Sequence, residues 1–254
     1  MKKTSFEFEV DASGLKVDIG MPVGFPYIPF PTAVSLIETT KFCTQHRVPV
    51  RQISPVGCSL VTDARSAVVD EFLKGDSSHL FWVDADMAWR TLDFLRLMSF
   101  CTRPGVDVVG ATYTPKSEPA RFMVRNISKV PGPYGLIEVS GLGLGFTIMR
   151  REVVRKIADS KPWVISNGAT TRMRDVFRLD KVASDHRLGE DMAFFQDIRD
   201  AGYKVWMDPE VDLSHVGLKL YGGSVMDAVR KAMPDAFESE LQDLPPGAKF
   251  VQST

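Results

Sequence analysis

The feature that most constrains the fold is a short apolar run, His79-Leu80-Phe81-Trp82-Val83, which ends directly in Asp84-Ala85-Asp86. An unbroken run of this length is typical of a central strand that is covered by other elements on both faces. In open α/β sheets, ligands bind outside the carboxyl ends of the strands. The sequence therefore predicts that two carboxylates lie at the ligand-binding edge of a sheet.

The segments around this run alternate between strand and helix patterns. Strands are predicted over residues 15–21, 48–53, 79–83 and 106–111, and helices over 32–46, over 61–74 and from 91 onward. Thr32 stands where the N-cap of the first helix is expected. This alternation favours a Rossmann-like α/β class with a mostly parallel central sheet and helices on both faces.

The second half of the chain has a different pattern and predicts a small mixed region. Its expected elements are strands over 121–124, 136–139 and 203–207, an apolar segment over 144–149, and helices over 151–158 and 190–200. Residues 160–188 have few apolar anchors, which predicts a long, partly mobile loop. We expect a lead-in over 1–14, one domain over 15–232 with halves 15–112 and 113–232, and a weakly ordered tail over 233–254.

Composition narrows the class of protein. The net charge of −1 gives no electrostatic footprint for tight nucleic-acid binding. No apolar run approaches the roughly 20 residues that span a bilayer, and the N-terminus lacks a signal-peptide core, so we expect a soluble, cytoplasmic protein without a transmembrane segment. The three cysteines, Cys43, Cys58 and Cys101, are scattered, which argues against a disulfide framework or a zinc site built on them.

Asp84 and Asp86 indicate a cation site. Residues two apart in an extended chain point to the same side, so these carboxylates repel each other unless a positive charge joins them. Mg²⁺ and Mn²⁺ prefer carboxylate, water and phosphate oxygens, and they suit this position. The alternative is a pair of turn acids that cap the next helix or face water.

Glu190 and Asp191 open a predicted helix that buries Phe194, Phe195 and Ile198. Asp191 leans toward this apolar face, and the helix dipole favours a negative charge in the first turn. A carboxylate that is held inward but ionised suits general-base chemistry. Ordinary placement of acids in the first turn is the alternative, and it explains Glu190 fully.

Three further side chains are candidates for the same site. His215 follows the last predicted strand, and its imidazole suits Mn²⁺ alongside carboxylates, although a structural histidine is the alternative. Arg65 is placed to hold a diphosphate with two hydrogen bonds, or else it faces solvent and pairs with Asp63 or Asp70. Lys116 is a similar and weaker candidate.

Taken in order along the chain, these residues resemble the glycosyltransferases with the type A fold, and the family 2-like group in particular. The resemblance covers residues 15–217. Its marks are a strand followed by Pro22, Arg65 on a helix, Asp84-Ala85-Asp86, the small-residue segment 141–151 that includes Gly143, Gly189-Glu190-Asp191, and His215. Chain order and length are similar to compact phage and bacterial members.

The resemblance implies a nucleoside-diphosphate sugar donor, with a UDP-sugar expected. The implied donor-binding residues are Pro22, Arg65, Asp84, Ala85 and Asp86. Asp86 and His215 would ligate Mn²⁺ or Mg²⁺, with Asp84 near the metal or the ribose. Asp191 would be the base of an inverting transfer, with Glu190 as the second candidate, and Gly143 and Lys116 would lie on the acceptor side.

Several alternatives stay open at this point. The acceptor is a polysaccharide, a lipid-linked sugar, a protein or a modified base in phage DNA, and a retaining transfer is the alternative to an inverting one. A nucleotidyltransferase is disfavoured because the loop after the first strand, residues 22–26, has no basic residue. A non-catalytic module that binds carbohydrate or a partner on the same scaffold is the third reading.

Overall fold

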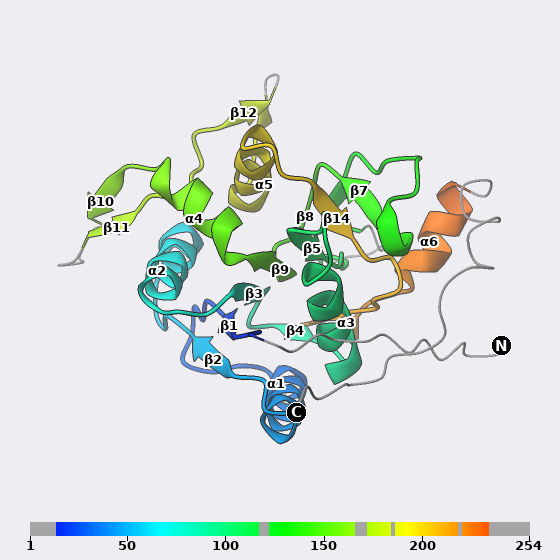
Figure 1. The fold of residues 1–254 in the computed structure, drawn as a ribbon, viewed down its shortest axis with the longest axis horizontal. Helices are drawn as coiled ribbons and strands as arrows, with labels where there is room; N and C mark the ends of the chain where they lie inside the picture. The colour runs from blue at the N-terminus through cyan, green and yellow to red at the C-terminus, as the bar shows by residue number, and fades with distance from the viewer. Residues whose placement is uncertain (1–13, 117–121, 166–171, 184–185, 218–219, 234–254) are drawn as a thin grey trace.

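The computed structural model describes residues 14–116, 122–165, 172–183, 186–217 and 220–233, which are drawn in colour in Figure 1. Their centre is a seven-stranded sheet with the strand order β2-β1-β3-β9-β5-β14-β7. In chain order its strands are β1 (Val17–Gly20), β2 (Val50–Ile53), β3 (His79–Val83), β5 (Val108–Gly110), β7 (Ile137–Val139), β9 (Phe146–Arg150) and β14 (Val205–Met207).

The sheet is mostly parallel. β1 pairs in parallel with β2 and β3, and β14 pairs in parallel with β5. β9 lies antiparallel between β3 and β5, and β7 is antiparallel to β14 at one edge. The other five strands therefore share one direction, which confirms the predicted α/β class and is consistent with the type A fold that the sequence resembles.

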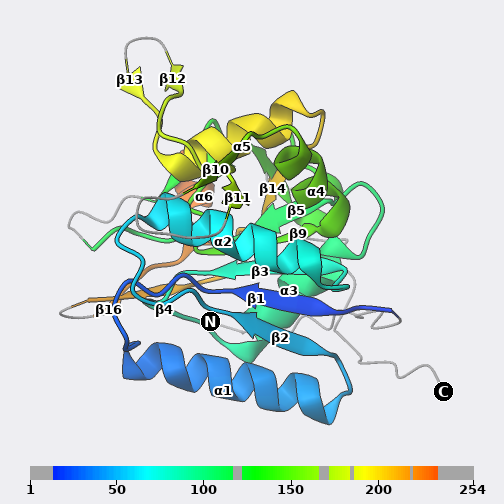
Figure 2. The same cartoon turned by 90° about the vertical axis from the view of Figure 1, so that its left-hand side faces the viewer.

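Helices cover both faces of the sheet (Figure 2). α1 (Phe30–Gln45) and α3 (Thr91–Cys101) lie on one face, and α2 (Val61–Lys74), α4 (Arg151–Asp159) and α5 (Glu190–Asp200) lie on the other. α6 (Val225–Ala232) follows the last small strands. No helix of the described ranges is long and apolar enough to cross a bilayer.

The packing of β3 explains why its sequence has no polar residue between His79 and Asp84. Its side chains alternate between two cores, with Leu80 and Trp82 facing the α2 side and Phe81 and Val83 facing the α3 side, all fully or almost fully buried. Each such side chain contributes about 1.5–3 kcal/mol on burial. The strand is therefore apolar on both faces until it reaches Asp84 at the sheet edge.

Two expectations about local structure are wrong. α1 begins at Phe30 with Pro29 in the N-cap position, so Thr32 lies inside the first turn and not at the N-cap. Prolines suit this place, because the first helical turn needs no backbone donors. Residues 160–188 are not a structureless loop, since the described part forms the hairpins β10 (Trp163–Ile165) with β11 (Arg172–Arg174) and β12 (Val182–Ala183) with β13 (His186–Arg187).

Smaller sheets complete the fold at its edges. β15 (Ser214–Val216) pairs antiparallel with both β4 (Met87–Ala88) and β16 (Leu220–Tyr221). β6 (Val124–Arg125) pairs with β8 (Gly141–Leu142), and a short 3-10 helix spans Pro133–Gly135. Cys43, Cys58 and Cys101 are free thiols. The predicted lead-in up to residue 13, Arg121 and the tail from residue 234 lie outside the described residues.

Candidate active site

A pocket of about 660 Å³ opens beyond the carboxyl ends of β1 and β3. It collects most of the residues that the sequence singles out, although they come from segments up to 193 positions apart. Those among its lining residues are Pro22, Arg65, Asp84, Ala85, Asp86, Lys116 and His215. The fold therefore places carboxylates, cationic side chains and an imidazole together in one pocket, where ligand sites of open α/β sheets are expected.

Asp86 and His215 meet because β15 pairs with β4. His215 stands opposite Met87 in this pairing, and the Val216 amide donates to the Asp86 carbonyl at 2.7 Å. The His215 Nε2 atom then lies 3.3 Å from Asp86 Oδ2. On the other side of the ring, Nδ1 lies 2.9 Å from the Thr114 carbonyl oxygen.

These contacts determine what lies between the two side chains. A carbonyl oxygen only accepts, so Nδ1 carries the hydrogen, and in the neutral ring Nε2 presents a lone pair to a carboxylate. Two acceptors at this distance need a proton or a metal cation between them. Burial works to lower the pKa of His215, but the hydrogen bonds to Asp86 and to the Thr114 carbonyl outweigh it and raise the pKa.

Lys116 competes for the same carboxylate oxygen. Its Nζ donates to Asp86 Oδ2 at 2.5 Å, and its stem packs where a Cβ on Gly217 would lie 3.1 Å from Lys116 Cδ. Burial works to raise the pKa of Asp86, yet the hydrogen bonds from His215 and Lys116 outweigh it and lower the pKa to about 2. Asp86 is therefore ionised at neutral pH.

Asp84 is bound differently from Asp86. Arg65 Nη2 donates to its Oδ1 at 3.1 Å, and the Tyr113 hydroxyl donates to its Oδ2 at 3.1 Å. Burial and the negative charge of Asp84 raise the pKa of Tyr113 well above its usual value, so the phenol stays a donor. Both oxygens of Asp84 are held by protein donors, whereas Asp86 shares a single oxygen between its two partners.

Sequence reasoning missed Tyr113, and the glycines around it explain its position. The Gly145 amide donates to the Tyr113 hydroxyl at 3.3 Å. A Cβ on Gly145 would lie 2.4 Å from Asp84 Oδ2, and a Cβ on Gly143 would lie 2.6 Å from the Tyr113 hydroxyl. Gly143 therefore packs under Tyr113, and its acceptor-side role stays a prediction. The Gly143-x-Gly145 spacing could have indicated that a bulky side chain packs here, because glycine allows close approach of a neighbour.

Arg65 connects the pocket to α5. It is buried, and besides Asp84 it donates from Nη1 to Glu190 Oε1 at 2.9 Å. Burial works to lower the pKa of Arg65, and the charges of Asp84 and Glu190 outweigh it. The alternative of a solvent-facing Arg65 is wrong.

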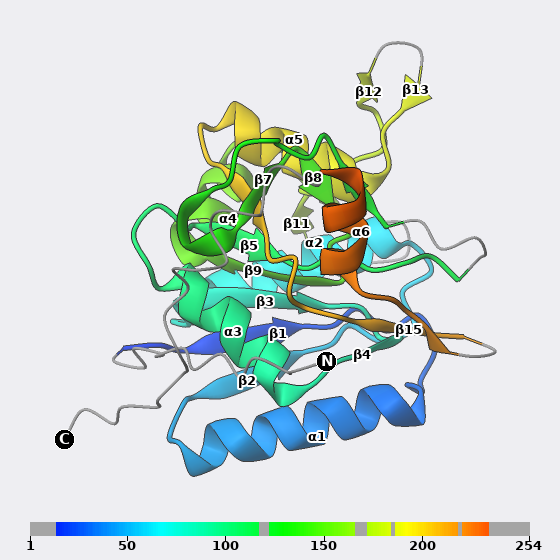
Figure 3. The same cartoon turned by 90° about the vertical axis from the view of Figure 1, so that its right-hand side faces the viewer.

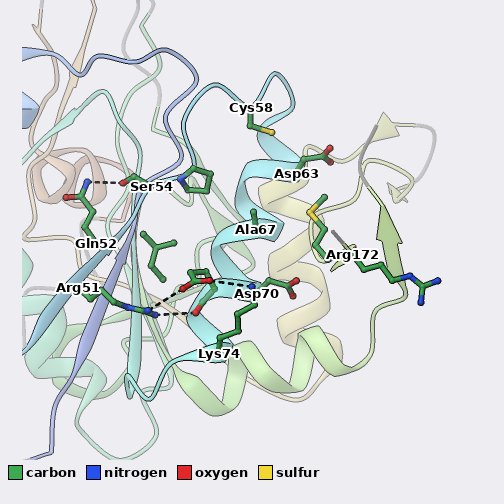
Figure 4. A pocket seen from close by; sticks show the side chains of 13 residues that line it. Arg51, Gln52, Ser54, Cys58, Asp63, Ala67, Asp70, Lys74 and Arg172 are labelled. Carbon is green, nitrogen blue, oxygen red and sulfur yellow. Dashed lines mark hydrogen bonds and ion pairs between the residues drawn. The ribbon is translucent and has the colours of Figure 1, made fainter. Parts of the chain in front are cut away.

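The alternative partners of Arg65, Asp63 and Asp70, lie on the outer face of α2. There they line a second cavity of about 600 Å³ between α2, β2 and β11 (Figure 4). Arg51 in that cavity pairs with Asp18 at 2.6 Å and more distantly with Glu71 at 3.5 Å, and Lys74 lies 3.4 Å from Glu71. This cavity shares no lining residue with the pocket that holds Arg65.

Asp191 lies next to the pocket without lining it. Its Oδ1 accepts from the Met192 amide at 2.8 Å, and it makes no ion pair with any described residue. Burial raises the pKa of Asp191, Glu190 and Asp84 add to this, and Arg65 opposes it. A half-buried carboxylate with a raised pKa is a better proton acceptor than an ordinary surface aspartate.

No protein-family model matches the chain, and no curated protein matches its sequence. Among solved structures, the crystal structure of A197 from STIV is similar to this chain, with a TM-score of 0.50 and 20% identity. The likeness covers 80% of this chain and 86% of A197. At this identity the likeness establishes a shared fold.

Two other structures have lower scores. GalNAc-T7 with UDP, GalNAc and Mn²⁺ has a TM-score of 0.47 and 10% identity over 80% of this chain and 44% of its own. A mutant of Drosophila β1,4-galactosyltransferase 7 in complex with manganese, UDP-Gal and xylobiose has a TM-score of 0.45 and 13% identity, covering 94% of this chain and 82% of its own. At these scores each likeness is limited to the general arrangement of strands and helices.

The chemistry of the donor set fits a divalent cation with few protein ligands. Within the described residues, no group of three or more His, Cys, Asp or Glu side chains is arranged to hold a metal. Asp86 and His215 are two such ligands, and the Thr114 carbonyl orients the imidazole in the way that outer partners of metal-bound histidines do. Mg²⁺ and Mn²⁺ sites of enzymes commonly take one or two protein ligands and complete their shell with water and phosphate.

Proposed function

We propose that this chain is a metal-dependent glycosyltransferase that moves a sugar from a nucleoside-diphosphate sugar to an acceptor hydroxyl. The observation that carries the proposal is the contact of Asp86 Oδ2 with His215 Nε2 inside a pocket that also holds Pro22, Arg65 and Lys116. Two acceptors that face each other create a place for a cation, and the pocket beside them has room for an anionic ligand. We assign residues 15–112 to the donor half and 113–232 to the acceptor half.

We infer the roles of the donor-side residues from their contacts. A divalent cation held by Asp86 and His215 would neutralise the charge that develops on the leaving diphosphate. Lys116 was expected on the acceptor side, but it contacts Asp86, and we therefore infer that it lies within reach of the same anion. Arg65 is buried and donates to Asp84 with one nitrogen and to Glu190 with another. It therefore links the end of β3 to the start of α5.

Asp191 is our candidate for the base of an inverting transfer. Its proton affinity is raised by burial, whereas Glu190 is already paired with Arg65. In this step the acceptor oxygen bonds to the anomeric carbon, and the bond from that carbon to the diphosphate oxygen breaks. The acceptor proton passes to Asp191, and the nucleoside diphosphate leaves.

The test is thermal melting with UDP and Mn²⁺ separately and together. We expect a rise in melting temperature that needs both, because a ligand that binds only the folded state stabilises it. Asp86→Ala should lose the joint effect while it keeps a cooperative transition. Asp76→Ala, which removes a surface carboxylate paired with Lys16, is the matched control and should retain it. No joint effect with UDP or any other nucleoside diphosphate would contradict the proposal.

A further inference from the structure

Two consecutive carboxylates, Glu190 and Asp191, open α5 beside one buried cation, Arg65. Figure 3 shows α2, which carries Arg65, on the same face of the sheet as α5 and opposite to α1. By sequence, either carboxylate is a candidate for the base of the transfer. The structure gives them different relations to the cation, and this difference bears on which of them accepts a proton.

Both terminal nitrogens of Arg65 donate to carboxylates other than Asp191. Nη1 donates to Glu190 Oε1 at 2.9 Å, and Nη2 donates to Asp84 Oδ1 at 3.1 Å. The side chain of Arg65 is only 5% exposed, and its Cζ atom lies 5.9 Å from the centroid of the Phe177 ring. A planar guanidinium that is buried and bound on two sides has a defined orientation. It is therefore directed to its two partners and not to Asp191.

Apolar rings surround this ion pair on the side of Phe177. The Phe177 amide donates to Ser66 Oγ at 3.3 Å, next to Arg65 on α2. Its ring stacks on Phe194 of α5 with centroids 4.5 Å apart, and Trp82 of β3 meets it edge to face at 5.5 Å. Charges interact more strongly beside apolar groups than in water. The charge on Glu190 therefore acts on its neighbours with little screening.

Asp191 has a backbone partner only. Its Oδ1 accepts from the Met192 amide at 2.8 Å, and it pairs with no cation in the part of the chain that the structure describes. The charged or titratable side chains that act on it come from four elements, and they are Arg65 of α2, Glu190 of α5, Asp84 at the end of β3 and Tyr113 after β5. β8 and β14 also pack against α5, and neither strand carries a charged residue.

The charge of Glu190 affects Asp191 in two ways. Burial raises the pKa of Asp191, Arg65 opposes this, and Glu190 adds to it because two negative charges repel each other. Glu190 also neutralises part of the charge of Arg65, the cation that favours the ionised form of Asp191. A neutral side chain at position 190 would remove the repulsion and leave Arg65 with Asp84 as its only bound carboxylate. Both changes would make Asp191 a weaker proton acceptor.

We propose that Glu190 is a positioning residue whose charge binds Arg65 and thereby leaves Asp191 unpaired as the base of the transfer. The task of Asp191 in the transfer rests on the proposed function, whereas the coupling of the two carboxylates through Arg65 does not. Glu190 does not line the pocket, and its Oε1 atom is bound to Arg65. We therefore assign it no proton transfer of its own.

The experiment is an NMR titration of the full chain with ¹³C-labelled aspartate in metal-free buffer, and Asp191→Asn identifies the carboxyl signal of Asp191 by its loss. Glu190→Gln keeps an oxygen for Arg65 but removes the charge, so the titration midpoint of Asp191 should shift to lower pH. Glu190→Asp keeps the charge and should shift the midpoint less. Glu152→Gln, which neutralises a first-turn glutamate of α4 beside Arg150, is the matched control and should leave the midpoint unchanged.

Two results would overturn the proposal. They are a midpoint that does not move to lower pH in Glu190→Gln, and equal shifts in Glu190→Gln and Glu190→Asp, which would mean that the charge is not the cause. The titration needs neither donor nor acceptor, so it is independent of transfer. A shifted midpoint without the joint effect of UDP and Mn²⁺ on melting of the original chain would contradict the glycosyltransferase and leave the coupling intact. The joint effect without a shift would leave the glycosyltransferase standing and remove Glu190 from the positioning role.

Discussion

The hydroxyl of Tyr113 donates to Oδ2 of Asp84 at 3.1 Å, while Arg65 holds Oδ1 of the same carboxylate. Asp84 is thus bound on both oxygens by donors of the protein itself. Two positions later, Asp86 faces the pocket with His215 and Lys116. The two aspartates therefore line one pocket but differ in their contacts, because protein donors hold both oxygens of Asp84 and only one oxygen of Asp86.

Removal of the Tyr113 hydroxyl should loosen this edge. Tyr113→Phe leaves one oxygen of Asp84 and the Gly145 amide without their partner, and we expect the free energy of unfolding to fall by about 1–3 kcal/mol. Urea denaturation measures this loss. Tyr203→Phe, at a half-buried tyrosine outside the site, should change it by less than about 0.5 kcal/mol. Equal effects in the two variants would contradict a special role for Tyr113.

Gly145 should not tolerate a side chain. A Cβ there would lie 2.4 Å from Asp84 Oδ2 and 2.8 Å from the Tyr113 hydroxyl, so Gly145→Ala has to displace both. We expect a cost of about 1–3 kcal/mol in unfolding free energy, together with a weaker joint effect of UDP and Mn²⁺ on melting. Gly223→Ala is the control, because Gly223 does not line the pocket and its Cβ would meet only Phe122 Cζ, at 3.8 Å. A fully stable Gly145→Ala protein would show that the edge is not closely packed.

Lys116 should weaken metal binding in the absence of a nucleotide. Its ammonium lies on the oxygen of Asp86 that a cation would use. Lys116→Ala should therefore bind Mn²⁺ alone up to roughly fivefold more tightly, because a partly exposed ion pair is worth at most about 1 kcal/mol. Isothermal titration calorimetry measures the affinity, with Lys41→Ala as a surface control. Weaker Mn²⁺ binding in Lys116→Ala would mean that the lysine does not compete for Asp86.

Asp191 should set the acid side of the pH–rate profile. A base acts in its ionised form, so the rate should fall as the pH drops through a pKa that burial, Glu190 and Asp84 raise and Arg65 opposes. Asp191→Asn should lower turnover by roughly 10²- to 10⁴-fold and leave binding of UDP with Mn²⁺ unchanged. Steady-state rates with the identified acceptor, measured across pH, test this. Unchanged turnover in Asp191→Asn would remove it from the base role.

The sign of the same shift also bears on stability. A carboxyl whose pKa is raised in the folded state stabilises the fold while it is protonated, and this contribution is lost as the pH rises through the folded pKa. At neutral pH, Asp191→Asn should therefore keep or raise the melting temperature. A large loss of stability would indicate a structural role for the carboxylate.

A buried ion pair away from the pocket should dominate global stability. Arg96 Nη2 donates to Asp208 Oδ1 at 3.1 Å, Nε donates to the other oxygen, and Asp208 is fully buried. Arg96→Ala leaves this carboxylate buried without the cation, and we expect about 3–5 kcal/mol lower unfolding free energy. Denaturant unfolding tests it, and adding Asp208→Asn should restore part of the loss. Arg178→Ala breaks an exposed pair with Asp180 and should cost less than about 1 kcal/mol.

Local sequence patterns predicted several helices and strands correctly. The run before Asp84 is β3 with its predicted bounds, and the helices predicted over 61–74 and 190–200 are α2 and α5. Each has a signal that neighbouring residues carry, namely an unbroken apolar run or helical spacing of apolar residues. The predicted start of α1 was wrong because Thr32, which resembled an N-cap, is buried inside the first turn. Its hydroxyl makes no hydrogen bond with any described residue.

By itself the sequence determined the fold class and the position of Asp84 and Asp86 at a strand end, because strand and helix periodicity depend on residues close together in the chain. Only the tertiary structure decided that Arg65 faces Asp84 and Glu190, that Tyr113 closes the edge, and that β15 brings His215 to Asp86. These contacts join segments 19 to 129 residues apart, and their existence depends on strand order and register. Neither is encoded in a local pattern, since both depend on how the whole sheet packs.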